Sequence, residues 1–133
     1  AIRRQRQMCI RDSHVTVGNN VTIGAFTTIH QFCQMGDYSF AGMNSSITMD
    51  VPAYIKVASN PARVIGLNSV GMERGGIDQE IITILKKGYK TVYRKGLNLR
   101  DAIKKLESMS SSDVKEIQNF INSLKSSERG ILR

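Results

Sequence analysis

A six-residue repeat runs from Val17 to Pro52 and restricts the folds open to this chain. Written in sixes, the segment reads VGNNVT, IGAFTT, IHQFCQ, MGDYSF, AGMNSS and ITMDVP. The first position of every hexad is apolar, and the fifth is small or β-branched. This period matches neither the 3.6 residues of an amphipathic helix nor the two residues of a strand, so each hexad is expected to be a short strand followed by a turn.

Units of this kind stack into a solenoid, with the first position in the core and the fifth packed beneath it. Gly or Asn is expected to take the positive φ at each turn. With three hexads per triangular coil, residues 14–52 would form about two coils. Each coil buries its apolar faces only against neighbouring coils, and repeat folds need about three repeats to be stable. We therefore expect the chain to be the end of a longer solenoid.

Four ordered motifs accompany the repeat: IHQFC at 29–33, DVPAY at 50–54, GLNSVGM at 66–72 and RGILR at 129–133. The hexads resemble the hexapeptide acyltransferases, and the motifs are similar to those of the UDP-N-acetylglucosamine acyltransferases over roughly residues 14–133. The resemblance implies a left-handed parallel β-helix over 14–52. It also implies a connector with a nucleotide-binding segment over 53–76 and a small C-terminal α-helical domain over 77–133.

Residues 1–13 are outside this resemblance. They have no hexad frame, and Arg11 stands where an inward aliphatic residue is expected. We interpret the segment as artefactual, since it resembles translated adapter read-through rather than native sequence. A nucleic-acid-binding or targeting arm is the functional alternative.

Three amphipathic helices are predicted after residue 76, because apolar residues recur there at helical spacing. The first is expected to end at Lys95-Gly96. Their predicted N-terminal caps are Asp78 for the first, Asn98 for the second, and Ser112 or Asp113 for the third. The aromatic residues in these stripes are expected to be core residues rather than ligand platforms.

Positive charge is concentrated in the second half of the chain. The net charge is +8, and residues 53–133 contain 15 basic and 8 acidic side chains. A basic face can be a solvated surface, or it can bind nucleic acid, a membrane surface or an acidic protein. The resemblance implies that the partner is acyl carrier protein. No nucleic-acid binding is predicted, because no recognition motif accompanies the charge.

Other features exclude several classes of protein. Cys9 and Cys33 lack the spacing of a metal or redox motif, so no metal site is predicted. No organic cofactor is implied either. No stretch approaches the roughly 18 to 20 apolar residues of a membrane-spanning helix. We therefore expect a cytoplasmic protein without membrane insertion.

Transfer of an acyl group from a thioester to a sugar hydroxyl needs a general base, for which histidine is suited. His14 and His30 are the two histidines of the chain. The resemblance implies that neither is the base, because the catalytic histidine of the family lies about one coil before the position of His14. It is therefore expected upstream of residue 1, and no catalytic residue is assigned within this chain.

By the same resemblance, His14 lines the sugar cleft, and Gln31 of the His30-Gln31 pair contacts the sugar nucleotide. The alternative for both histidines is a structural role in a turn.

Asn68 and Arg74 match the nucleotide-binding segment of the family. An arginine fork suits a diphosphate, because it forms two parallel charge-assisted hydrogen bonds.

The connector departs from the family pattern. Residues 71–76 read GMERGG where GLKRRG is common. Gly75 therefore stands in the place of an arginine, and Glu73 brings an acidic side chain into the segment. Val70 stands where an acidic residue is frequent. These differences bear on the nucleotide affinity and on the identity of the donor sugar.

Met43 comes two hexads after the His30-Gln31 pair, at the position that floors the acyl groove between neighbouring subunits in the family. We predict that it acts as an acyl-chain ruler and favours a donor near ten carbons. The alternative is an outward or interface packing residue.

The activity implied by the resemblance is that of an acyl-[acyl-carrier-protein]–UDP-N-acetylglucosamine O-acyltransferase, which adds a 3-hydroxyacyl chain to the sugar 3-hydroxyl in the first step of lipid A synthesis. A homotrimer is implied, with acyl carrier protein and UDP-N-acetylglucosamine as partners. Two alternatives stay open: a sister hexapeptide N-acyltransferase acting on a UDP-amino sugar, and a non-catalytic trimeric binding or scaffold module.

Overall fold

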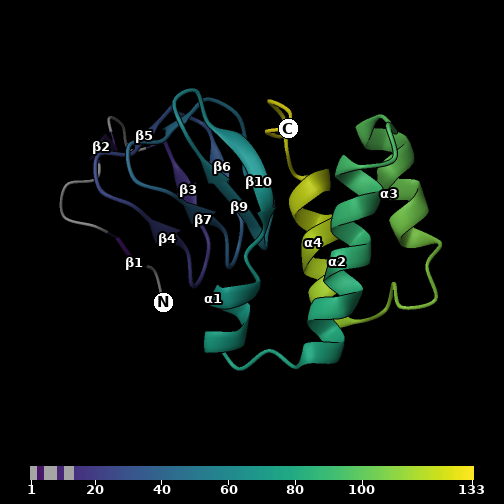
Figure 1. Cartoon of the computed structure of the whole chain (residues 1–133). Helices are drawn as coiled ribbons and strands as arrows, with labels where there is room; N and C mark the ends of the chain where they lie inside the picture. The colour runs from purple at the N-terminus through teal and green to yellow at the C-terminus, as the bar shows by residue number, and fades with distance from the viewer. Residues whose placement is uncertain (1–2, 5–8, 11–13) are drawn as a thin grey trace.

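Short stacked strands are followed by a helical bundle (Figure 1). The structure, a computed structural model, describes residues 3–4, 9–10 and 14–133. The strands are β1 (Arg3–Arg4), β2 (Cys9–Ile10), β3 (Thr16–Val17), β4 (Thr22–Ile23), β5 (Thr28–Ile29), β6 (Gln34–Met35), β7 (Phe40–Ala41), β8 (Ser46–Ile47), β9 (Ile55–Ala58) and β10 (Arg63–Leu67). The helices are α1 (Ser69–Arg74), α2 (Gln79–Tyr93), α3 (Leu99–Glu107) and α4 (Lys115–Lys125).

The strands form three sheets within the described residues. Sheet A has the order β1-β4-β7-β9-β10, sheet B is β2-β5-β8 and sheet C is β3-β6. From β3 to β8 the chain visits C, A and B in turn, and each strand pairs in parallel with the strand three hexads further along, as in Thr16 with Gln34 and Thr28 with Ser46. The expected coil length of three hexads is thus confirmed, and the first part of the fold is a three-sided parallel β-helix.

Two strands within residues 1–13 are described, and they add to this β-helix. β1 pairs with β4 and β2 pairs with β5, both in parallel. The register differs here by a single position from that of the later coils: Arg3 lies opposite Thr22, whereas Thr22 lies opposite Phe40. The interpretation of residues 1–13 as artefactual falls mostly outside the described residues and stays a prediction.

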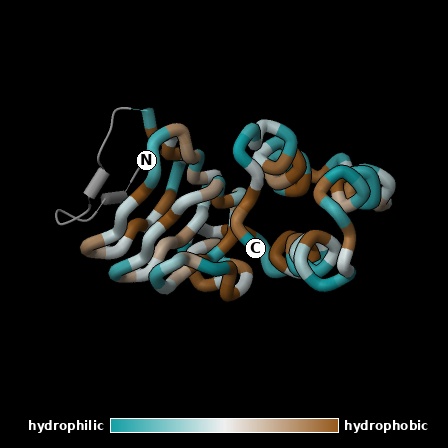
Figure 2. Tube along the Cα trace, turned by 90° about the horizontal axis from the view of Figure 1, so that it is seen from above, coloured by the Kyte–Doolittle hydropathy of each residue, from teal (hydrophilic) through white to brown (hydrophobic). Residues whose placement is uncertain are grey.

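The interior of the β-helix is filled as the hexads predict. Figure 2 shows hydrophobic and hydrophilic residues alternating along the stacked coils. The first hexad position is buried in all but the first hexad, where Val17 is half-buried. The buried residues of this position are Ile23, Ile29, Met35, Ala41 and Ile47. The fifth position is buried throughout, at Val21, Thr27, Cys33, Ser39, Ser45 and Val51. Two of the three hydroxyls at this position donate to a turn carbonyl, as Thr27 Oγ1 does to Gly24 O at 2.8 Å, whereas the buried Ser39 Oγ has no hydrogen-bond partner among the described residues.

The turns differ from the expectation in one respect. Positive φ falls on the fourth hexad position, at Asn20, Phe26, Phe32, Tyr38 and Asn44. The prediction is therefore right for the two asparagines and wrong for the glycines that follow the apolar residue. Those glycines serve close approach between coils: a Cβ at Gly24 would lie 2.6 Å from the backbone nitrogen of Met43.

Residues 53–76, expected to be a connector, contain two strands and a helix. β9 continues sheet A by pairing in parallel with β7, and β10 returns antiparallel to β9. The helix α1 follows directly. The hairpin of β9 and β10 does not follow the six-residue period, so the sequence shows no repeat in this segment. The proposed domain division at residue 52 stays a prediction.

The helical bundle begins largely where the caps predict. Asp78 is the N-cap residue of α2, although its side chain makes no capping hydrogen bond. Asn98 caps α3, since its Oδ1 accepts from Asp101 N at 2.8 Å. The start predicted for the last helix falls slightly too early: Val114 is the N-cap of α4, because Ser111 O accepts the Val114 N–H in a preceding turn.

The bundle and the β-helix share a continuous buried core. Figure 1 shows α2 to α4 beside the β-helix, with the C-terminal end of the chain between them. Helix α4 makes several of the hydrogen bonds across this contact. Its Ser123 Oγ accepts from Ala53 N at 3.0 Å, and Phe120 and Ile121 are almost fully buried. Since α4 abuts the β-helix, it limits what can reach that side of the coils.

Candidate functional site

The turns of the β-helix line up in three corners, named here by the sheets that they join. The B–C corner contains residues 30–33 and 48–51 and the residues just before β3. The C–A corner contains residues 18–21 and 36–39. The A–B corner contains residues 24–27 and 42–45. Every residue that the sequence marks as a substrate contact lies at or beside one of these corners.

His14, His30 and Gln31 meet at the B–C corner. The His14 ring stacks on Phe32, with centroids 5.0 Å apart and planes 22° apart. The Phe32 N–H also donates to His14 O at 2.7 Å, so backbone and ring together fix the two turns in line. The side chains of His30 and Gln31 are exposed. The corner therefore presents two imidazoles and a carboxamide on neighbouring turns.

Cys33 lies beneath this corner and is fully buried. Burial raises the pKa of its thiol, and the nearby positive charge of Arg129 opposes that shift. A neutral, enclosed thiol is a poor nucleophile. Cys33 therefore fills the core and carries no chemistry at the corner.

Asn68 and Arg74 lie at the two ends of α1, beside the C–A corner. Asn68 is almost fully buried: its Nδ2 donates to Tyr38 O at 2.7 Å and its Oδ1 accepts from Gly71 N at 3.2 Å. Both polar atoms are thus engaged in holding α1 to the corner. Arg74, at the last turn of α1, is exposed. The structure therefore shows Asn68 positioning α1, and its contact with a nucleotide stays a prediction.

Gly75, the departure from the family pattern, has a steric reason. A Cβ at this position would lie 2.7 Å from the Tyr38 ring and 2.8 Å from its hydroxyl. Tyr38 in turn stacks on Tyr54 with centroids 5.8 Å apart. The tyrosine pair thus occupies the space that a side chain at residue 75 would need.

A polar network that the sequence did not reveal joins α4 to the same corner. Asn119 Nδ2 donates to Asp37 Oδ2 and to the Tyr54 hydroxyl, both at 3.0 Å. Burial raises the pKa of Tyr54 to about 12, although the bond from Asn119 works in the opposite direction. Asp37 and Asn119 are 82 residues apart, and nothing in their local sequence signals the pairing.

Met43 lies at the A–B corner and is 65 % exposed. Phe26, on the preceding coil of the same corner, is 58 % exposed. Exposed apolar side chains on successive coils form a surface suited to contact with another molecule. Both the ruler role of Met43 and its alternative, outward packing, stay predictions.

The predicted contacts thus fall into three groups at three corners. Helix α4 lies between the first two groups, since its Asn119 bonds Asp37 and the following Ser126 bonds Gln34. One chain therefore brings His14, His30 and Gln31 together, but it separates them from Arg74 and from Met43.

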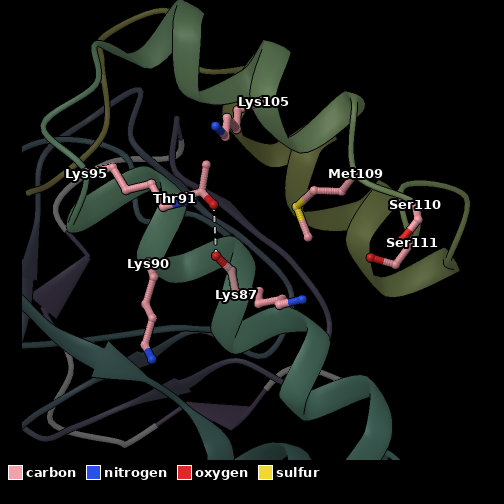
Figure 3. A pocket seen from close by; sticks show the side chains of 8 residues that line it. All are labelled: Lys87, Lys90, Thr91, Lys95, Lys105, Met109, Ser110 and Ser111. Atoms are coloured by element: carbon pink, nitrogen blue, oxygen red, sulfur yellow. Dashed lines mark hydrogen bonds between the residues drawn. The ribbon is translucent and has the colours of Figure 1, made fainter.

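A basic pocket lies on the helical bundle (Figure 3). It has a volume of about 310 Å³ and is lined by Lys87, Lys90, Thr91, Lys95, Lys105, Met109, Ser110 and Ser111. Its four lysines come from α2, from the residues after it and from α3, and no carboxylate is among the lining residues. Figure 3 shows Met109 pointing toward α2, where Thr91 Oγ1 donates to Lys87 O at 2.9 Å. The pocket therefore combines an apolar wall with a cationic rim.

The part of the chain that the structure describes lacks two further features. No group of three or more His, Cys, Asp or Glu side chains is placed to hold a metal ion. Among the described helices, none is both long and apolar enough to cross a membrane.

Sequence comparison places the chain among known proteins. The family model described as "Udp N-acetylglucosamine O-acyltransferase; Domain 2" matches residues 50–132. A protein of Pseudomonas syringae pv. tomato named "Acyl-[acyl-carrier-protein]--UDP-N-acetylglucosamine O-acyltransferase" is 41 % identical over 90 % of this chain and 46 % of its own length. A protein of the same name from Ectopseudomonas mendocina is 42 % identical with the same coverage.

Solved structures agree with these matches. LpxA from Acinetobacter baumannii superposes with a TM-score of 0.86 at 42 % identity, and the enzyme from Moraxella catarrhalis with 0.86 at 39 % identity. Each alignment covers 90 % of this chain and 46 % of the other chain. The chain therefore spans about half the length of its relatives. On the family model and these relatives, the chain belongs to the UDP-N-acetylglucosamine O-acyltransferase family.

Proposed function

We propose that this chain is part of an acyl-[acyl-carrier-protein]–UDP-N-acetylglucosamine O-acyltransferase that transfers a 3-hydroxyacyl group to the sugar 3-hydroxyl in lipid A synthesis. The observation that carries the proposal is the match of relatives with this named activity over 90 % of the chain. The protein acts in the cytoplasm and needs no metal or organic cofactor. The general base is a histidine upstream of residue 1.

The β-helix is left-handed and has about two coils over residues 14–52. The hexad pattern and the three-hexad register support this assignment. Three copies associate side by side through their coils. Two observations support the trimer: Phe26 and Met43 expose apolar surface at the A–B corner, and the predicted contacts lie at corners that one chain keeps apart.

Within such a trimer, one site takes residues from two neighbours. The B–C corner of one copy supplies His14, His30 and Gln31 to the sugar. The α1 segment of the next copy supplies Arg74, whose exposed guanidinium bonds the diphosphate in a bidentate manner. Asn68 supports this contact, because its two hydrogen bonds hold α1 against Tyr38.

The basic pocket between α2 and α3 binds acyl carrier protein. Four lysine ammonium groups surround it, and none of its lining residues is acidic. An acidic protein would be drawn to this surface, and opposite charges raise the rate of encounter. The apolar stems of the lysines and Met109 offer contact area once the partner has docked. Nucleic acid is not a proposed partner.

The test is an acyl-transfer assay with a chain extended upstream to the full length of its relatives. We expect transfer from 3-hydroxyacyl carrier protein to UDP-N-acetylglucosamine. The present chain alone should be inactive, because loss of a general base costs roughly two to four orders of magnitude in rate. Turnover by the short chain within tenfold of the long one would overturn the assignment of the base. No transfer by the long chain would favour a scaffold, and transfer only to a UDP-amino sugar would favour the N-acyltransferase alternative.

A further inference from the structure

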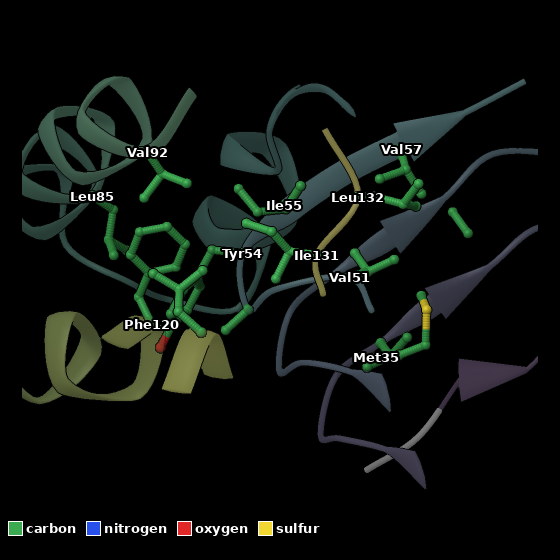
Figure 4. Close-up of a cluster of buried hydrophobic side chains, with 14 of the residues drawn as sticks. Met35, Val51, Tyr54, Ile55, Val57, Leu85, Val92, Phe120, Ile131 and Leu132 are labelled. Carbon is green, nitrogen blue, oxygen red and sulfur yellow. The ribbon is translucent and has the colours of Figure 1, made fainter. Parts of the chain in front are cut away.

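The C-terminal tail of the chain, residues 126–133, returns to the base of the β-helix. Ile131 forms a parallel bridge with Asp50: Asp50 N donates to Gly130 O at 3.0 Å, and Leu132 N donates to Asp50 O at 2.8 Å. Ile131 and Leu132 are almost fully buried. In Figure 4 they lie in the cluster that also contains Val51. The tail is thus an integral strand-like layer beneath the last coil.

A buried carboxylate sets the register of this tail. Asp50 is 3 % exposed, its Oδ1 accepts from Gln34 N at 2.8 Å, and its Oδ2 accepts from Ser127 Oγ at 2.6 Å. Ser127 Oγ in turn accepts from Gly130 N at 3.1 Å. Gly130 has a φ of 98°, and a Cβ there would lie 2.8 Å from Met49 Cε. These contacts hold the backbone on either side of Arg129, at Ser127 and at Gly130, close to the β-helix.

The Arg129 side chain lies against the B–C corner. Arg129 Nη1 donates to Gln31 O at 3.4 Å, and Arg129 Nη2 donates to Thr48 O at 3.5 Å. The two carbonyls belong to successive turns of the corner, so one planar guanidinium bridges two coils. A lysine carries its three donors on one nitrogen, so it lacks the two separate nitrogens with which the guanidinium reaches the two carbonyls. Of these two turns, the one formed by residues 30–33 carries His30 and Gln31.

We infer that Arg129 is a positioning residue for substrate binding: it clamps the His30-Gln31 turn from below and so fixes the direction of the Gln31 side chain. The inference rests on the proposed function, in which Gln31 contacts the sugar nucleotide. Arg129 itself makes no substrate contact. Because the clamp acts on a residue that binds substrate in the ground state as well as in the transition state, its loss affects KM rather than kcat.

The experiment compares Arg129→Ala, Arg129→Lys and Arg133→Ala in the full-length trimeric protein. Arg133 is a matched control, because it is in the same tail and donates to a backbone carbonyl, that of Val92 on α2, at 3.1 Å. We expect Arg129→Ala to raise the KM for UDP-N-acetylglucosamine about fivefold with kcat within about twofold. Arg129→Lys should recover part of the loss, and Arg133→Ala should leave KM unchanged.

A double-mutant cycle with Gln31→Ala isolates the route of the effect. If Arg129 acts through Gln31, Arg129→Ala should add nothing to KM once Gln31 is truncated. Full additivity of the two changes would overturn the inference, and so would an equal rise in KM for Arg129→Ala and Arg133→Ala. An unchanged KM in Arg129→Ala would overturn the inference alone, whereas an unsubstituted protein without turnover would overturn the proposed function.

Discussion

Replacing Asp50 by alanine measures how firmly the tail is held to the β-helix. The carboxylate is 3 % exposed and accepts two hydrogen bonds, from Gln34 N and from Ser127 Oγ. Hydrogen bonds to a charged group contribute about 1.5 to 3 kcal/mol each, and the hydroxyl of Ser127 can rotate toward another acceptor. We therefore expect Asp50→Ala to lower the free energy of unfolding by about 3 kcal/mol.

This loss translates into a shift in melting temperature. Unfolding entropies near 60 °C correspond to about 0.3 kcal/mol/K for a chain of this size, so Tm should fall by about 10 °C. Asp50→Asn keeps an oxygen for Gln34 N and offers an amide to Ser127 Oγ, so it should cost about 1 kcal/mol.

Thermal melts followed by circular dichroism, at one fixed protein concentration because association shifts Tm, give both values. A decrease in Tm of less than about 3 °C for Asp50→Ala would refute the reasoning, and so would equal decreases in Tm for Asp50→Ala and Asp50→Asn.

The remaining predictions concern substrate and pH. Arg74→Ala should raise the KM for the sugar nucleotide by the equivalent of about 1.5 to 3 kcal/mol, with partial recovery in Arg74→Lys; unchanged binding by calorimetry would make the segment purely structural. Met43 should favour a ten-carbon over a fourteen-carbon donor by about 3 kcal/mol, and an unaltered preference in Met43→Gly would exclude a ruler. Since the pKa of Tyr54 is raised to about 12, the fold favours the neutral phenol. Its contribution to stability should be present below about pH 10 and fade toward pH 12, whereas Tyr54→Phe should lose this pH dependence.

The coiled part of the fold was predictable because its signal is local and repeated. Apolar residues such as Ile23 and Ile29 recur every six positions, and three hexads return the chain to the same face, which the register confirms. The start of α3 was equally accessible, since Asn98 caps it through its own side chain. The signals behind these predictions lie within one turn or one period.

The contacts that the sequence did not reveal join distant segments. Asp37 meets Asn119 across 82 residues, and Arg129 meets Gln31 across 98 residues. Neither pair shows a recurring spacing in the sequence, because the two residues meet only when α4 and the tail pack against the β-helix. The internal use of the Asn68 amide was hidden for the same reason, since its partner is a backbone carbonyl at Tyr38.

The distribution of predicted contacts over separate corners has a genetic consequence. If each site combines the B–C corner of one copy with α1 of the next, two damaged versions of the protein can repair each other. In randomly mixed trimers of Gln31→Ala and Arg74→Ala chains, about one site in four would join an intact corner to an intact α1. Co-expression of two alleles that each fail alone should then restore roughly a quarter of the sites, and such complementation is a property that a chain carrying its whole site cannot show.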